Sequence, residues 1–162
     1  MSKSDTCKYA TYRLAGLPAG VFGETYVIAA AMAEGTNVYR CEYFLLTKRD
    51  EPHFLHEAFT FEGDVPEELL KLDLDYLVGE SRQQAENYLS ERLFQIAEKK
   101  GRPNLLEYRY ELVEMPYMPL HGCWMRGEFM EETRKIVEAT RCGQLKRYLS
   151  LLVRSSFTRR PG

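Results

Sequence analysis

ETYVIAAAMAEGTNVYRCEYFLLT, residues 24–47, holds two runs of strand-forming residues on either side of a short polar turn. The runs extend from Glu24 to Ala33 and from Val38 to Thr47, and the turn between them is Glu34-Gly-Thr-Asn37. Strands joined by so short a connection pair in the antiparallel direction. The sequence therefore predicts a β-hairpin here.

Further strands are predicted on both sides of this hairpin. Cys7 to Ala15 precedes it, and Phe54 to Glu62 follows the polar turn at Lys48 to Pro52. Gly16 to Gly23 carries three Gly and one Pro, a composition that is typical of a loop. The three strands joined by short turns are thus expected to form an antiparallel meander.

Two helices are predicted after the fourth strand. Asp64-Val-Pro-Glu67 combines an N-cap acid, an early Pro and a capping-box Glu, so it begins a short helix that ends around 72–77. Gly79 is expected to break the chain, and Ser81-Arg-Gln-Gln84 to cap a second helix that ends at Gly101. Apolar residues of the second helix recur at helical spacing: Ala85, Tyr88, Leu89, Leu93, Ile96 and Ala97.

One more strand and two more helices complete the predicted order. Asn104 to Met115 alternates apolar and polar residues, which indicates a strand with one solvated face. An irregular loop over 116–126 follows it. Helical spacing then begins at Phe129 and is interrupted at Gly143 before a last helical piece.

Length and composition fit one ordinary globular domain. The 162 residues are 44% hydrophobic and 28% charged, which disfavours disordered, collagen-like and coiled-coil classes. The order ββββ-αα-β-αα predicts an α+β fold with an antiparallel sheet of about five strands and the helices packed on one face. The domain is expected over 7–154, between flexible tails at 1–6 and 155–162.

The cellular location is predicted from what the chain lacks. No apolar run approaches the ~18 residues of a membrane span, and the polar N-terminus has no export signal. Four widely spaced cysteines form no Cys-x-x-Cys pair: Cys7, Cys41, Cys123 and Cys142. We therefore expect reduced thiols in a cytoplasmic protein, although an even number of cysteines leaves disulfides open.

Charge is unevenly distributed along the chain. The net charge is −2, yet the last 24 residues carry six basic side chains and no acidic one. Such a basic tail binds nucleic acid, an acidic partner or the body of the protein. The alternative is that these cations accompany the end of a terminal helix, where its dipole favours them.

The loop PYMPLHGCW at 116–124 supplies one candidate for chemistry. His121 and Cys123 are two residues apart, so an extended backbone points both to the same side. A helix that begins shortly afterwards would lower the pKa of the thiol. One hypothesis is a Cys123 nucleophile with His121 as its base. In the alternative, Cys123 and Trp124 fill the core and His121 caps a turn.

Glu57 is a second candidate, because it falls in phase with Leu55 and Phe59 on the predicted fourth strand. A carboxylate on an apolar face has a raised pKa unless an arginine pairs with it. Arg40 and Arg13, on neighbouring strands, are the expected partners. The alternative is a β-bulge or a later strand start that leaves Glu57 in water.

A metal site is the third possibility considered. His53-x-x-His56 together with His121 and Cys123 offers four ligands of the kind that zinc prefers. Their spacing is not that of a zinc finger or ribbon, so we expect neither a metal nor another cofactor.

The tyrosine content offers a binding surface. The chain has 11 Tyr, and several lie on predicted strands, where they line an amphiphilic pocket, stack on bases or simply stabilise the sheet. The residues predicted to bind a ligand are Tyr39, Tyr43, Tyr108, Tyr110, Trp124 and Arg40.

The main functional hypothesis is a non-enzymatic one. The chain shows no P-loop, Gly-x-Ser-x-Gly, His-Glu-x-x-His or EF-hand pattern. We therefore expect a cytoplasmic module that binds a partner protein or an apolar small ligand, as a homodimer and without a membrane. The alternatives are a small enzyme that uses Cys123, His121 and Glu57, and RNA binding through the basic C-terminus.

Overall fold

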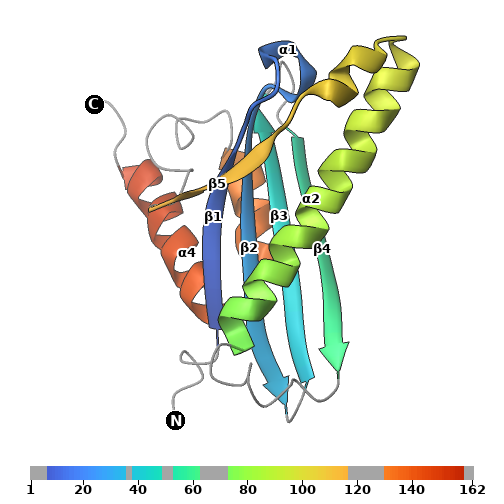
Figure 1. Ribbon diagram of the computed structural model, residues 1–162. Coiled ribbons are helices and arrows are strands. Elements are labelled where there is room, and N and C mark those ends of the chain that lie inside the picture. Colours follow the sequence, from blue (N-terminus) through green and yellow to red (C-terminus); the bar gives the residue numbers. More distant parts are fainter. Residues whose placement is uncertain (1–6, 36–37, 49–52, 63–72, 117–129, 159–162) are drawn as a thin grey trace.

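A computed structural model of the chain describes residues 7–35, 38–48, 53–62, 73–116 and 130–158. Five strands form one antiparallel sheet in the order β4-β3-β2-β1-β5 (Figure 1). This confirms the predicted α+β class and the five-stranded sheet. The strands are β1 (Cys7–Ala15), β2 (Glu24–Gly35), β3 (Val38–Lys48), β4 (His53–Glu62) and β5 (Glu111–Met115).

The predicted hairpin at the centre of the sheet is confirmed. β2 and β3 pair from Glu24↔Lys48 to Gly35↔Val38, with one register shift between Ala33 and Gly35. Neither strand alternates between buried and exposed residues: 25–31 and 41–47 are buried throughout. Because successive side chains of a strand point to opposite faces, both faces of these strands must be covered.

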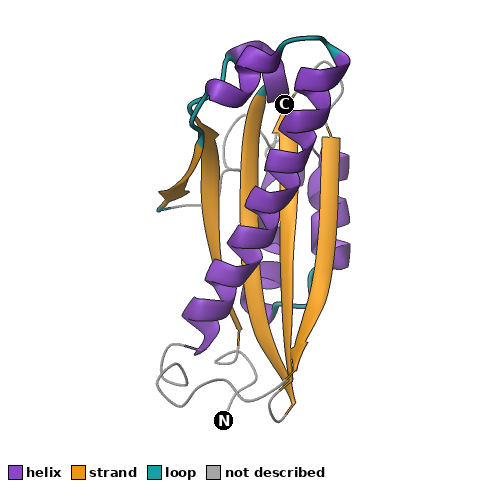
Figure 2. Cartoon of the chain, turned by 45° about the vertical axis from the view of Figure 1, so that its right-hand side comes forward, coloured by secondary structure: helices purple, strands orange, loops and turns teal. Residues whose placement is uncertain are grey.

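The helices lie on both faces of the sheet, whereas the sequence interpretation placed them all on one. The long helix α2 (Asp73–Lys99) crosses one face, and α3 (Met130–Ala139) and α4 (Gly143–Thr158) cover the other (Figures 1 and 2). Val27, Ala29 and Ala31 of β2 belong to the core under α2, whereas Ile28 and Ala30 belong to the core under α3 and α4. Two short elements, α1 (Ala19–Phe22) and η3 (Pro103–Glu107), complete the order.

Helix α2 is continuous where two helices were predicted. It passes through Gly79 without a break, and Ser81 lies in its interior rather than at its N-cap. The Ser81 hydroxyl is buried, 3.1 Å from the carbonyl oxygen of Leu77 and 2.9 Å from that of Ala30 on β2. A glycine inside a helix costs only about 1 kcal/mol, which packing against the sheet outweighs. The helix start predicted at Asp64 lies outside the described residues.

The C-terminal end of α2 matches its prediction. Gly101 has a φ of 61°, and the N–H of Arg102 donates to the carbonyl oxygen of Ala97 at 2.8 Å. These are the features of a Schellman cap, in which glycine adopts the left-handed conformation without strain. The predicted apolar stripe faces the sheet, with Leu89 and Leu93 buried in the core.

The strand predicted from Asn104 to Met115 is shorter in the structure. Pro103 to Glu107 forms the 3-10 helix η3, in which Leu105 is buried, and β5 begins only at Glu111. A proline suits the first turn of a helix, which explains why alternation alone misplaced this start. Among the described residues, no helix is long and apolar enough to cross a membrane.

Candidate functional site

A carboxylate is buried between the sheet and the two C-terminal helices. Glu42 is 1% exposed and lies on the same face of β3 as Phe44 and Leu46, which pack under α3 and α4. Burying a charged group is costly unless it is paired and hydrogen-bonded. The surroundings of Glu42 supply such partners.

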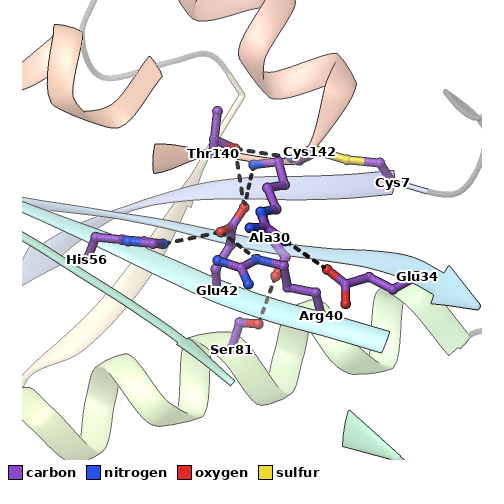
Figure 3. Close-up of polar contacts among 10 residues, drawn as sticks. Cys7, Ala30, Glu34, Arg40, Glu42, His56, Ser81, Thr140 and Cys142 are labelled. Atoms are coloured by element: carbon purple, nitrogen blue, oxygen red, sulfur yellow. Dashed lines mark hydrogen bonds and ion pairs between the residues drawn. A yellow bond between two sulfur atoms is a disulfide. The ribbon is translucent and has the colours of Figure 1, made fainter. Parts of the chain in front are cut away.

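Both carboxylate oxygens of Glu42 are held by protein groups (Figure 3). Oε1 accepts hydrogen bonds from Thr140 Oγ1 at 3.2 Å and from the backbone N–H of Arg141 at 3.3 Å. Oε2 lies 3.4 Å from Arg40 Nε and 3.2 Å from His56 Nε2. His56 stacks on Phe44, with ring centroids 4.6 Å apart. We call Glu42, Arg40, His56, Thr140 and Arg141 the Glu42 cluster.

The cluster stabilises Glu42 in its ionised form. Burial pushes the pKa of Glu42 upward, but hydrogen bonds from His56 and from the Arg141 backbone, with the charge of Arg40, bring that pKa below its ordinary value. The carboxylate is 1% exposed, and both of its oxygens contact protein groups, so it links the sheet to the junction between α3 and α4.

A disulfide lies beside the Glu42 cluster. Cys142 donates its backbone N–H to Thr140 Oγ1 at 3.3 Å, and its sulfur is bonded to Cys7 of β1, with Cα atoms 5.6 Å apart. The expectation of reduced thiols is therefore corrected for Cys7 and Cys142. Cys41 is free and buried, and burial raises its pKa to about 11, so it stays protonated near neutral pH.

Glu57, the candidate on β4, is exposed on the face of the sheet that α2 covers. Its Oε2 accepts a hydrogen bond from the Tyr43 hydroxyl at 2.5 Å, and burial together with this carboxylate raises the pKa of Tyr43. Leu55 and Phe59 pack against the core under α2, in phase with Glu57 as the sequence indicates. Of the two arginines expected to pair with Glu57, Arg40 instead contacts Glu42, and Arg13 lies on β1, which is not adjacent to β4.

The other predicted site residues do not meet in one place. Tyr39 and Tyr43 are buried under α2, whereas Arg40 lies on the opposite face in the Glu42 cluster. Tyr108 is exposed after η3, and Tyr110 donates to the backbone carbonyl of Glu86 on α2. The loop candidates, His121, Cys123 and Trp124, lie outside the described residues.

A depression borders β4 on the α2 side. It has a volume of about 440 Å³ and is lined by Tyr43, Glu57, Ala58, Phe59 and Gln84. Tyr43 and Glu57 are both residues that the sequence singled out. Gln84 was read only as part of a helix cap, and its position here depends on the unbroken path of α2, which the sequence pattern did not predict.

The outer edge of β4 is the second feature of this region. β4 pairs with β3 along its whole length, from Thr47↔His53 to Val38↔Glu62, and it ends the sheet order. Within the described part of the chain, no strand pairs with its other side. A strand in that position presents a row of backbone N–H and C=O groups that another strand can bind.

Metal-binding side chains do not gather among the described residues, where no group of three His, Cys, Asp or Glu is placed to hold an ion. Comparison with known proteins finds no family model, no curated protein and no solved structure that matches the chain.

Proposed function

We propose that the chain is a non-enzymatic protein-binding module that adds a strand of a partner polypeptide to the outer edge of β4. The observation that carries the proposal is the terminal position of this strand of 10 residues, which pairs with β3 without a bulge. In strand addition, main-chain hydrogen bonds supply affinity and adjacent pockets supply specificity. The depression lined by Tyr43, Glu57, Phe59 and Gln84 is such a pocket.

The sequence of β4 supports an edge kept open for binding. Proteins commonly protect edge strands with proline, lysine, bulges or short length. HFLHEAFTFE, residues 53–62, has no Pro, Lys or Arg, and its one central acid, Glu57, is hydrogen-bonded to Tyr43. The opposite edge differs, because β5 has only 5 residues.

The remaining expectations stay predictions. An apolar small ligand would use the same depression, but a carboxylate in its wall suits a polypeptide better. The enzyme alternative needs His121 and Cys123, which lie outside the described ranges, and the RNA-binding alternative depends on basic residues near the C-terminus. A cytoplasmic location is also a prediction, and the Cys7–Cys142 disulfide weighs against it, since disulfides persist in oxidising compartments.

Selection of peptides on the full chain tests the proposal. Random peptides of about ten residues, displayed on phage, are enriched against the immobilised protein, and the winners are synthesised. We expect them to slow amide hydrogen exchange at alternate residues of β4 and to leave β5 unchanged, because only outward N–H groups gain a partner. Failure of the monomeric chain to enrich any peptide, or peptides that protect no β4 amide, would overturn the proposal.

A further inference from the structure

We infer that the partner at the β4 edge is a second copy of this chain, paired with the first about a two-fold axis at Ala58. This inference rests on the proposed strand addition and names its occupant. Most soluble oligomers are symmetric, and a two-fold interface pairs the same surface with itself. Two β4 strands related in this way run antiparallel and join two five-stranded sheets into one.

Charge selects the register of the paired strands. Directly opposed residues of an antiparallel pair lie on the same face, so a two-fold near the middle of β4 is centred on either Glu57 or Ala58. Centring on Glu57 sets two carboxylates directly opposite each other, which is destabilising. Centring on Ala58 opposes two small, exposed side chains and moves the two Glu57 carboxylates from direct to diagonal positions, so this register is favoured.

The Ala58 register also fills the depression beside β4. It places Phe59 of the second copy directly opposite Glu57, on the face of the sheet that α2 covers. Directly opposed side chains have Cβ atoms about 5 Å apart, which brings the incoming aromatic ring to the depression of about 440 Å³. Phe59 itself lines the same depression in each copy, so both copies form identical contacts, as two-fold symmetry requires.

On the other face, the Ala58 register sets His56 opposite Thr60 of the second copy. His56 is partly buried and bound to Glu42, whereas Thr60 is exposed and presents a hydroxyl. No bulky side chain opposes another at the centre of the interface. The residues next to the axis can therefore oppose one another without two bulky side chains meeting.

Site-directed crosslinking tests both the dimer and its register. Cysteines are placed one at a time in the full chain as Ala58→Cys, Glu57→Cys and Thr60→Cys, each in a Cys123→Ser background. Cys41 is buried, so its thiol does not compete for the reagent. A short bismethanethiosulfonate then joins thiols that face each other. We expect a covalent dimer from Ala58→Cys at least tenfold faster than from the other two variants, because only residue 58 opposes its own copy.

Sedimentation equilibrium of the unmodified chain accompanies the crosslinking, with an expected mass about twice the 18.9 kDa of one chain. A dimer in which Ala58→Cys, which keeps both Glu57 carboxylates, crosslinks no faster than the other two variants overturns the register, and a dimer that crosslinks at none of the three positions overturns the interface. If the chain is a monomer that still binds selected peptides along β4, the inferred dimer is wrong but the proposed strand addition is retained. A monomer that binds no peptide overturns both.

Discussion

Thr140 donates a hydrogen bond to Glu42 at 3.2 Å, across 98 residues of chain. This bond joins the middle of the sheet to the junction between α3 and α4. The backbone N–H of Arg141 reaches the same oxygen, and Cys142 is bonded to Cys7 of β1. Three consecutive residues, Thr140, Arg141 and Cys142, thus link the C-terminal helices to the sheet, and the link through Cys142 is covalent.

Replacing the buried carboxylate should weaken the fold. Glu42→Gln removes the charge that faces Arg40 and His56, and a hydrogen bond to a charged group is worth about 1.5–3 kcal/mol. We expect the free energy of unfolding in urea to fall by about 2–3 kcal/mol. The control is Glu91→Gln on the exposed side of α2, which should change it by less than about 0.5 kcal/mol. If both substitutions lowered the free energy of unfolding equally, Glu42 would not stabilise the contact between the sheet and the C-terminal helices.

The same carboxylate predicts a pH dependence. Because its surroundings lower the pKa of Glu42, its contribution to stability is present above the ordinary value of 4.5 and is lost as the pH falls through the folded-state pKa. The gap in unfolding free energy between the natural chain and Glu42→Gln should therefore shrink as the pH drops below 4.5. Urea unfolding of both proteins over a pH series measures this gap. A gap that stays constant, or widens with acid, would show that Glu42 is not held as an anion.

The disulfide predicts a difference in thiol chemistry and in stability. Alkylation of the denatured chain without a reductant, followed by peptide mapping, should label Cys41 and leave Cys7 and Cys142 unlabelled. The bond joins residues 135 apart, and cross-links over long loops stabilise by about 2–5 kcal/mol. A reductant should lower the midpoint of thermal unfolding accordingly. Labelling of Cys7 and Cys142 in the purified, unreduced protein would contradict the pairing.

Two neighbouring residues of α2, one buried and one exposed, allow a controlled test of how this helix packs on the sheet. Leu93 is 4% exposed under the helix, and Phe94 beside it is 55% exposed. Leu93→Ala should cost about 2–5 kcal/mol of unfolding free energy because it leaves a cavity in the core. Phe94→Ala should cost about 0.5 kcal/mol or less, since its side chain faces water. The packing of α2 on the sheet would be disproved by a larger loss at Phe94 than at Leu93.

Local patterns predicted much of the fold. The hairpin at 24–47 depends on two strand-forming runs and a short turn, and the end of α2 depends on Gly101, so neighbouring residues suffice for both. The two-sided covering of the sheet was not predicted, although the apolar runs of β2 and β3 lack the alternation of a strand with one solvated face. The cap expected at Ser81 failed since its hydroxyl bonds to Ala30 on β2, a contact that no local pattern shows.

The site was far less predictable. The contact between Glu42 and Thr140 depends on which face α3 and α4 cover, and nothing near either residue in the sequence specifies that. Four cysteines allow three full pairings, so the Cys7–Cys142 bond was not determined by their number. Glu57 was recognised from its phase on β4, but its partner Tyr43 was identified only as one strand tyrosine among several.

Amide hydrogen exchange along β4 tests most directly whether its outer edge binds another strand. The measurement compares the natural chain at high concentration with Ala58→Arg, a substitution at an exposed position that sets two like charges opposite each other at the two-fold axis. The account predicts slow exchange at alternate amides between His53 and Glu62 in the natural chain, fast exchange at the same amides in the variant, and no difference along β5. Fast exchange at these amides in both proteins would contradict it.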